Sequence, residues 1–221
     1  MESNLLYRVQ REDLPRLESL LDRCFAHDPL YETLIPDPEV RARLMPELFR
    51  CDMDEFYATC EIFADSPALQ GVLVVSDRTE SFPMLRLLLT EAKAALVTDT
   101  CLIREDPSLT TFANFLMGEE YLNSAWTQEL HNEHRLHLIY LAVDPAMQHH
   151  GIAARLMDEA IAYAESHGLM ISLETHNAGN LSFYRHFGFQ LFKVVEKHFA
   201  LKQYCLIRPS TASVPAASVT G

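Results

Sequence analysis

The clearest alternation of hydrophobic and polar positions runs from Leu136 to Phe189. Leu136 to Val143 is an apolar run of β-strand length, and Asp144-Pro145 ends it. From Gly151 onward the apolar positions follow helical spacing instead, as Ile152, Leu156, Ala160 and Ala164. The pattern therefore predicts a strand, a tight turn and a long helix.

A second strand and a short helix complete this stretch. Gly168 suits the left-handed residue that commonly ends a helix. Leu169 to Thr175 then reads as a strand. Asn180 is a good N-cap for a helix over Leu181 to Phe187, which Gly188 ends.

The turn before the long helix is a candidate phosphate-binding loop. Met147 to Ala153 places consecutive backbone N–H groups at the helix N-terminus. Such a terminus leaves about four N–H groups unpaired and carries partial positive charge, so it can hold phosphate. The turn has neither the Gly-Lys-Ser/Thr of a P-loop nor the three glycines of a dinucleotide-binding turn.

The rest of the chain also alternates between strand and helix patterns. Before residue 136 we expect a strand at Leu5–Gln10, a helix from Asp13 with Leu17, Leu20, Leu21 and Phe25 inward, a loop at His27–Pro38, a helix at Glu39–Tyr57, paired strands at Thr59–Ala64 and Gly71–Ser76, and an apolar core helix at Pro83–Val97. After residue 188 we expect a hairpin of Phe189–Val195 with Gln203–Ile207, and a disordered tail at 209–221.

An aromatic segment lies between the expected third and fourth strands. Pro107 to Leu130 carries Phe112, Phe115, Leu116, Leu122 and Trp126 at near-helical spacing, which predicts an inserted helical pair. These aromatic residues either pack on the sheet, as buried aromatic residues commonly do, or cover a substrate pocket. The sequence leaves both interpretations open.

Composition limits the classes of function. The chain of 221 residues is 48% hydrophobic and 22% charged, as expected of one globular domain, which we place at residues 1–208. Its formal net charge of −13 argues against binding to nucleic acid or to an anionic membrane surface. The N-terminus has no apolar signal-peptide core, and five cysteines lack paired close spacing. A reduced, cytoplasmic setting is therefore expected.

Two motifs in order resemble the GNAT superfamily of N-acetyltransferases. The first motif follows the Leu136–Val143 strand and comprises Val143, Pro145, Gln148, Gly151 and Ala153. The second comprises Leu173-Glu174, Asn180, Phe183-Tyr184 and Gly188-Phe189. The resemblance is strongest over residues 131–208. It implies a single α/β domain with a mixed, mostly antiparallel sheet of six or seven strands, splayed between strands 4 and 5, with helices on both faces.

The resemblance also implies acetyl-CoA as the co-substrate. The residues expected to bind it are Leu141, Ala142, Val143, Gln148, His149, His150, Gly151, Ile152, Ala153, Ala154, Asn180 and Tyr184. Pantetheine would pair with backbone near Leu141 and Val143, and Gly71 to Val74 would lie beside the acyl group. Where the family often has Gly, Arg or Lys, this chain has His149 and His150, so pyrophosphate would depend on backbone N–H groups and on Arg155.

The family's general acid corresponds to Tyr184, one helical turn after Asn180. It would protonate the departing thiolate, although Tyr184 could also be a packing residue. The nearest candidates for the general base are His137, Glu174 and Glu133, and solvent or another residue is the open alternative. By simple alternation His137 would share a strand face with Ile139 and Leu141, unless a β-bulge changes that face.

Two other kinds of chemistry receive little support. Along a strand His134 and His137 face opposite ways, and HNEHRLH lacks the HExxH spacing, so we expect no metal site from His131, Glu133, His134 and His137. No cysteine lies in either motif, so direct transfer is expected rather than a cysteine acyl intermediate.

The predicted function is therefore acetyl transfer from acetyl-CoA to an amine, expected to be a small cationic molecule because the chain is acidic. The alternative is a non-catalytic acyl-CoA-binding sensor. Another acyl chain or a hydroxyl acceptor is a further alternative, and a homodimer is an open expectation.

Overall fold

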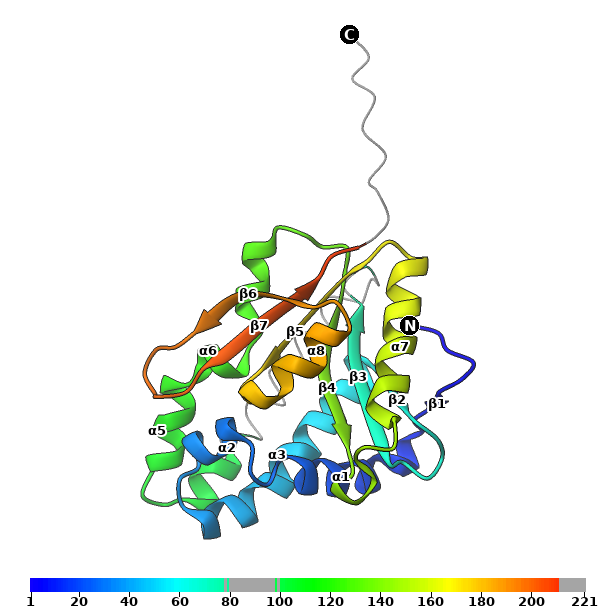
Figure 1. Cartoon of the computed structure of the whole chain (residues 1–221). Coiled ribbons are helices and arrows are strands. Elements are labelled where there is room, and N and C mark those ends of the chain that lie inside the picture. Colours follow the sequence, from blue (N-terminus) through cyan, green and yellow to red (C-terminus); the bar gives the residue numbers. More distant parts are fainter. Residues whose placement is uncertain (78, 80–97, 99, 211–221) are drawn as a thin grey trace.

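The protein is built on a seven-stranded mixed sheet with the strand order β1-β2-β3-β4-β5-β7-β6 (Figure 1). The computed structural model describes residues 1–77, 79, 98 and 100–210. Every neighbouring pair of strands is antiparallel except β4 and β5, which are parallel. This confirms the expected mixed, mostly antiparallel sheet in one α/β domain. The strands are β1 (Tyr7–Arg8), β2 (Glu61–Ala64), β3 (Gly71–Asp77), β4 (Arg135–Val143), β5 (Met170–Thr175), β6 (Gln190–Val195) and β7 (Gln203–Arg208).

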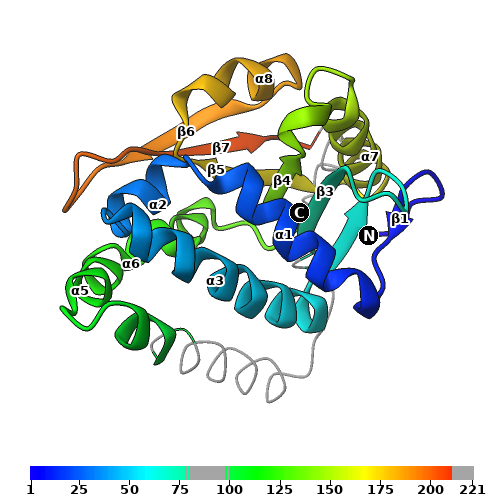
Figure 2. The ribbon, with the colours of Figure 1, turned by 90° about the horizontal axis from the view of Figure 1, so that it is seen from below.

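Helices cover both faces of the sheet (Figure 2). The α-helices whose full bounds are described are α1 (Leu14–Phe25), α2 (Pro29–Leu34), α3 (Pro38–Thr59), α5 (Thr110–Met117), α6 (Glu119–Leu122), α7 (Ile152–Ser166) and α8 (Leu181–His186), and residues 100–105 are also helical. Short 3-10 turns are η1 (Arg11–Asp13), η2 (Ala125–Leu130), η3 (Pro145–Met147) and η4 (Ala178–Asn180). The inserted helical pair expected within Pro107–Leu130 is confirmed as α5 and α6.

Each face of the sheet has its own hydrophobic core. The face under α1 and α3 buries Val72, Val74 and Ala142, whereas the face under α7 buries Leu73, Val75 and Leu136. This is the alternation expected of strands that are covered on both sides. The helical spacing predicted for the apolar positions of α7 is confirmed, because these residues are all buried: Ile152, Leu156, Ala160 and Ala164.

A β-bulge in β4 decides which side chains reach each face. The pairing with β3 passes from Tyr140↔Val74 to Leu138↔Val75, so Ile139 has no opposite residue. Ile139 and Tyr140 consequently both pack toward the α1–α3 side. His137 therefore shares its face with Tyr140 and Ala142, and the simple alternation that grouped His137 with Leu141 is wrong.

β4 and β5 separate after a short common ladder. Their parallel pairing covers only Arg135–Leu138 against Met170–Leu173. From Ile139 to Val143, β4 keeps β3 on one side but has no strand on the other among the described strands. This is the expected splay between the fourth and fifth strands, and it opens the sheet beside the start of α7.

The segment expected to be a loop at His27–Pro38 contains a short helix, so that prediction is corrected. In α2, Pro29 occupies the first turn and the Asp28 side chain accepts a hydrogen bond from Leu30 N at 2.9 Å. The prolines that suggested a loop therefore begin two helices, because Pro38 starts α3 in the same way. The helix expected at Pro83–Val97 and the tail from 211 onward lie outside the described residues.

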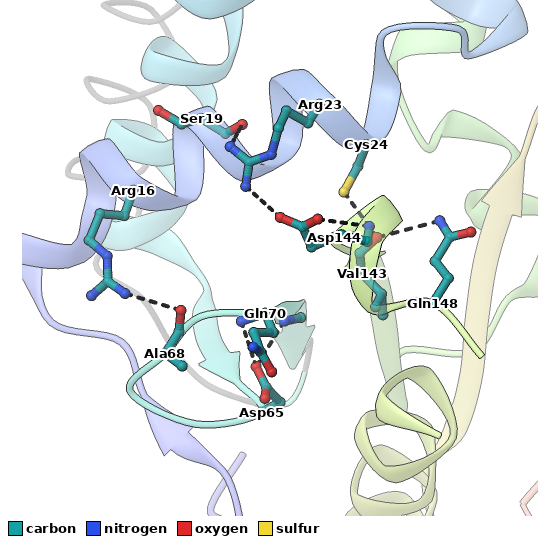
Figure 3. A network of polar contacts seen from close by, with 12 residues as sticks. Arg16, Ser19, Arg23, Cys24, Asp65, Ala68, Gln70, Val143, Asp144 and Gln148 are labelled. Carbon is teal, nitrogen blue, oxygen red and sulfur yellow. Dashed lines mark hydrogen bonds and ion pairs between the residues drawn. The ribbon is translucent and has the colours of Figure 1, made fainter. Parts of the chain in front are cut away.

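A polar network holds the end of β4 against α1 (Figure 3). Arg23 Nη2 donates to Asp144 Oδ2 at 2.7 Å, and Cys24 Sγ donates to the Val143 carbonyl at 3.3 Å. Asp144 N also donates to Gln70 O at 2.8 Å, which joins this end of β4 to the β2–β3 loop. The loop before α7 thus starts from a firmly held strand end.

No helix among the described residues is both long enough and apolar enough to cross a membrane.

We predict that Gly71→Ala destabilises the protein, because α7 crosses β3 closely at this glycine. An added Cβ would lie 2.5 Å from Ile152 Cγ2 and 3.1 Å from Leu156 Cδ1. Overpacking of this kind costs about 1–3 kcal/mol, to be measured by urea unfolding. Ser76→Ala on the same strand, which adds no volume, should cost less. Equal stability of Gly71→Ala and the wild type would contradict this packing.

Candidate functional site

The loop before α7 presents free backbone N–H groups. His149 and Gly151 both have positive φ, at 64° and 78°, and Gly151 is the N-cap of α7. The first intrahelical bond runs from Arg155 N to Gly151 O at 3.0 Å. The N–H groups of Ile152, Ala153 and Ala154 therefore precede the helix's own hydrogen bonding. An added Cβ at Gly151 would meet no atom within 4 Å, so the space above this turn is open.

A cavity of about 420 Å³ lies beside this turn, and we call it the α7 cavity. It is bounded by β4, the loop, the start of α7 and α8. Its lining residues are Leu141, Val143, Met147, Gln148, His149, Gly151, Ile152, Ala153, Ala154, Asn180, Phe183 and Tyr184. The structure thus brings together ten of the twelve residues that the sequence predicted for cofactor binding.

The two other predicted residues face elsewhere. Ala142 is buried in the core under α1 and α3, on the opposite face of β4. His150 is exposed, and its Nδ1 lies 2.8 Å from Gln148 O. Arg155 likewise does not line the α7 cavity, because its guanidinium donates to Asp65 O at 3.2 Å and pairs with the Asp65 carboxylate at 3.5 Å. Positive charge at the loop therefore comes from the helix terminus rather than from this arginine.

Tyr184 reaches the cavity from α8. The turn before α8 is capped by Asn177, whose Oδ1 accepts from Gly179 N at 2.9 Å. Asn180 makes no cap hydrogen bond, and its Nδ2 instead donates to Thr175 Oγ1 at 3.2 Å, so the expected capping role of Asn180 is corrected. Burial, with the Glu174 carboxylate as a smaller cause, raises the pKa of Tyr184 to about 12. The phenol is therefore protonated at neutral pH.

A second cavity, of about 320 Å³, lies on the other face of β4, and we call it the α3 cavity. Its lining residues come from α1, α2, α3, α5, α6, α8, β4 and β5 and their connections, with Thr98 in addition. They are Phe25, Asp28, Leu30, Tyr31, Leu48, Asp52, Phe56, Thr98, Phe115, Tyr121, Leu122, Ile139, Tyr140, Leu141, Glu174, Thr175, His176, Asn180 and Tyr184. The inserted segment thus contributes to this pocket, and Trp126 and Phe112 pack in the core beside it.

Three residues line both cavities: Leu141, Asn180 and Tyr184. They stand where β4 and β5 separate, so the two cavities adjoin at the splay of the sheet. A group bound along the α7 cavity and a second molecule in the α3 cavity would meet beside the Tyr184 side chain. This shared wall is where a transfer reaction between two ligands could take place.

Glu174 and His137 belong to one buried polar network. Ser124 Oγ donates to Glu174 Oε1 at 2.6 Å and lies 2.9 Å from His137 Nε2, while Trp126 Nε1 donates to Glu174 Oε2 at 2.9 Å. Burial alone would raise the pKa of Glu174, but His137 and these hydrogen bonds outweigh it and hold the pKa at about 2. Such a carboxylate is a weak base.

The two predicted base residues differ in their access to the cavities. Glu174 lines the α3 cavity, whereas His137 is not among the residues that line either cavity. The other ring nitrogen of His137, Nδ1, lies 2.8 Å from Ser172 Oγ. The network ties the inserted segment to β4 and β5, which holds Glu174 at the cavity wall.

Sequence reasoning missed two polar residues of the α3 cavity. His176 lies two positions after Glu174, so period-two alternation could have placed both on one face. Its Nε2 is buried and has no hydrogen-bond partner in the described structure, and burial lowers the pKa of the ring to about 4. Asp52 had no sequence signal, because one acidic residue in a long amphipathic helix normally faces solvent.

The cysteines, His131 and His134 lie apart from this chemistry. Burial raises the pKa of Cys24 and Cys205 to about 12 and that of Cys60 to about 11, so none of these thiols is activated as a nucleophile. His131 and His134 are exposed. The described residues hold no group of three or more His, Cys, Asp or Glu side chains arranged for a metal ion.

The fold is similar to that of three solved structures of acetyltransferases, one of them putative. Histone acetyltransferase HPA2 and related acetyltransferase from Corynebacterium glutamicum has a TM-score of 0.62 at 17% identity, over 97% of this chain and 99% of that chain. Ribosomal-protein-S18-alanine N-acetyltransferase from Escherichia coli has 0.51 at 13%, over 94% and 95%. The putative acetyltransferase yncA from Salmonella typhimurium, solved with its cofactor acetyl-CoA, has 0.50 at 12%, over 97% and 99%.

At these identities, the likeness to solved structures shows the fold alone. No curated protein sequence matches the chain. A model of the acetyltransferase (GNAT) family, however, matches residues 73–189, which is more than half of the sequence and includes β4, the loop before α7, β5 and α8. The chain therefore belongs to the GNAT acetyltransferase family.

Proposed function

We propose that the protein transfers an acetyl group from acetyl-CoA directly to the nitrogen of a small-molecule amine. The observation that carries this proposal is the pair of adjoining cavities that share Leu141, Asn180 and Tyr184. One cavity lies at a helix N-terminus suited to phosphate, and the other is a separate chamber for an acceptor. A sensor that only binds acyl-CoA would need the first cavity but not the second.

The α7 cavity suits coenzyme A. The N–H groups of Ile152, Ala153 and Ala154 would hold the pyrophosphate, with the open space above Gly151 allowing its close approach. The unpaired side of β4 near Leu141 and Val143 would hold the pantetheine. When bound, acetyl-CoA supplies an acetyl group that its thioester has activated toward nucleophiles.

Tyr184 is the proposed proton donor. It stands in the wall between the two cavities, it is protonated at neutral pH, and no described residue accepts a hydrogen bond from its hydroxyl. The hydroxyl can therefore donate a hydrogen bond to a sulfur that develops negative charge. The proposed base remains among the residues of the α3 cavity wall. Glu174 faces the cavity there, although its low pKa suits it better to orienting an amine than to removing a proton.

An acceptor screen tests the proposed reaction. Purified protein is incubated with acetyl-CoA and individual amines, alcohols or no acceptor, and released thiol and acetylated product are both measured. Product with amines only would support N-acetylation. Acetylation of alcohols in preference to amines would contradict the amine acceptor. Tight CoA binding with no transfer to any acceptor would favour the sensor.

We predict that Gly151→Ala weakens CoA binding about tenfold or more, because a methyl group would project into the space through which phosphate reaches the helix N-terminus. Gly188→Ala is the matched control, since its φ of 81° imposes similar strain away from both cavities. Each variant should lose about 1–2 kcal/mol of stability, but only the first should lose affinity in calorimetry. Unchanged affinity of folded Gly151→Ala would remove the phosphate-loop assignment.

We predict that Tyr184→Phe lowers kcat by about 10- to 1000-fold and leaves acetyl-CoA affinity nearly unchanged. The phenyl ring keeps the packing of Tyr184 in the core under α7 and removes only the hydroxyl. Tyr204→Phe on β7, whose side chain lines neither cavity, is the control and should retain wild-type turnover. Steady-state kinetics with an accepted amine decide the result. Wild-type kcat in Tyr184→Phe would exclude a proton-donor role.

A further inference from the structure

The α3 cavity is acidic at both of its ends. Its described lining includes the carboxyl groups of Asp28, Asp52 and Glu174 but no lysine or arginine. Its histidine, His176, is neutral at pH 7 because burial lowers the pKa of the ring to about 4. A chamber whose described fixed charges are all negative favours a cationic ligand and disfavours an anionic one.

One carboxylate oxygen of Asp52 is free to accept a hydrogen bond from a ligand. Its Oδ2 accepts a hydrogen bond from the Tyr140 hydroxyl at 2.6 Å, and the Tyr31 hydroxyl lies 3.3 Å from that of Tyr140. Its Oδ1 has no hydrogen-bond partner among the described residues. Burial raises the pKa of Asp52 to about 6, so the group is still mainly a carboxylate at neutral pH. A buried carboxylate without a cation is stabilised strongly when a cation pairs with it.

Aromatic rings surround the same end of the cavity. The Tyr140 ring centroid lies 5.4 Å from that of Phe25 and 5.9 Å from that of Phe56, and Tyr31 completes the lining there. Aromatic faces attract a cation within about 6 Å and are enriched where ammonium groups bind. The rings and Asp52 therefore favour the same kind of ligand group.

Asp52, Tyr31 and Tyr140 line the α3 cavity and do not belong to the wall that the two cavities share. Tyr140 extends from β4 to α3, so the length of a tyrosine side chain and a 2.6 Å hydrogen bond separate Asp52 from the β4 backbone. At the shared wall stand Leu141 and Tyr184, and the buried, unpartnered Nε2 of His176 belongs to the β5 side of the cavity. A ligand that both pairs with Asp52 and reacts beside Tyr184 therefore needs one polar group for each of these two places.

We propose that the α3 cavity binds a diamine, with Asp52 holding the distal ammonium while the other amine reaches the wall beside Tyr184. This inference rests on the proposed acetyl transfer and names its acceptor class. Asp52 is then a specificity residue that positions the substrate.

The first test uses the wild-type protein and two acceptors of matched shape. Putrescine carries two amines, and n-pentylamine replaces one of them with a methyl group. We expect kcat/KM for putrescine to exceed that for n-pentylamine by about 30-fold or more, since a buried charge would otherwise stay unpaired. Cadaverine and n-hexylamine repeat the comparison at a greater spacing. Equal or greater kcat/KM for the monoamines at both lengths would overturn the diamine assignment.

The second test asks whether Asp52 is responsible. Asp52→Asn keeps an acceptor oxygen for Tyr140 and removes the charge, so it should lower the diamine preference to within a few-fold while n-pentylamine is still acetylated. Asp54→Asn is the matched control: it lies on the same helix, is 54% exposed, pairs only distantly with Arg11 at 3.9 Å, and should retain the preference. Retention of the preference in Asp52→Asn would overturn the role of Asp52.

The outcomes separate this inference from the proposed function. If monoamines are acetylated efficiently and diamines are not preferred, the result supports the proposed acetyl transfer and excludes the diamine site. If CoA binds but no amine of any kind is acetylated, the proposed function fails and the inference fails with it.

Discussion

The arrangement of the site depends on how far β4 and β5 stay paired. Their parallel ladder covers four residues on each strand, and β4 then continues to Val143 with β3 alone beside it. Backbone groups in a protein interior need hydrogen-bond partners, so an unpaired strand edge next to a cavity favours an extended ligand that can supply them. The same separation allows Tyr184 from α8 to reach the wall between the two cavities. Pairing of β4 with β5 along their whole length would close the opening between the two strands.

The two cavities beside this separation are lined by different kinds of chemical groups. The α7 side consists largely of backbone N–H groups at a helix N-terminus and small residues such as Gly151 and Ala153. Such a surface recognises phosphate through features of the backbone, so many side chains are compatible with it. The α3 side consists of side chains from several helices and strands, with carboxylates among aromatic rings. Its chemistry is therefore particular to this chain, and under the proposed function the selectivity for the acceptor would arise there.

The segment between β3 and β4 completes the acceptor side and is held in place by polar contacts. Ser124 and Trp126 both donate to Glu174 on β5. The Tyr121 hydroxyl accepts from Lys197 N at 2.6 Å and donates to Leu201 O at 3.3 Å, which joins the segment to the β6–β7 connection. Because these buried groups satisfy one another, they cost little desolvation energy and fix the position of the wall. Glu174 thus contributes to the site both as a charge in the cavity and as an anchor of the insert.

The sequence alone determined the parts whose information is local. Apolar runs of strand length, helical spacing and turn residues located β4, α7, β5, α8 and the β6–β7 hairpin, and two motifs located the loop at Gly151 and the tyrosine at position 184. Ten of the twelve expected cofactor residues line one cavity because that cavity is formed by a single continuous β–loop–α unit together with α8. The loop predicted at His27–Pro38 was wrong because Pro29 and Pro38 start helices there, and proline favours both helix starts and loops.

Only the tertiary structure decided the acceptor side. The bulge at Ile139 moved His137 to the face of Tyr140, and no alternation rule contains such an extra residue. Asp52 became a cavity residue because α3 packs against β4 at Tyr140, a contact between positions 88 residues apart. Burial then changed the acid–base character of Asp52, His176 and Tyr184. Long-range packing sets the solvation of each group, and solvation sets its charge, so these properties exist only once the chain has folded.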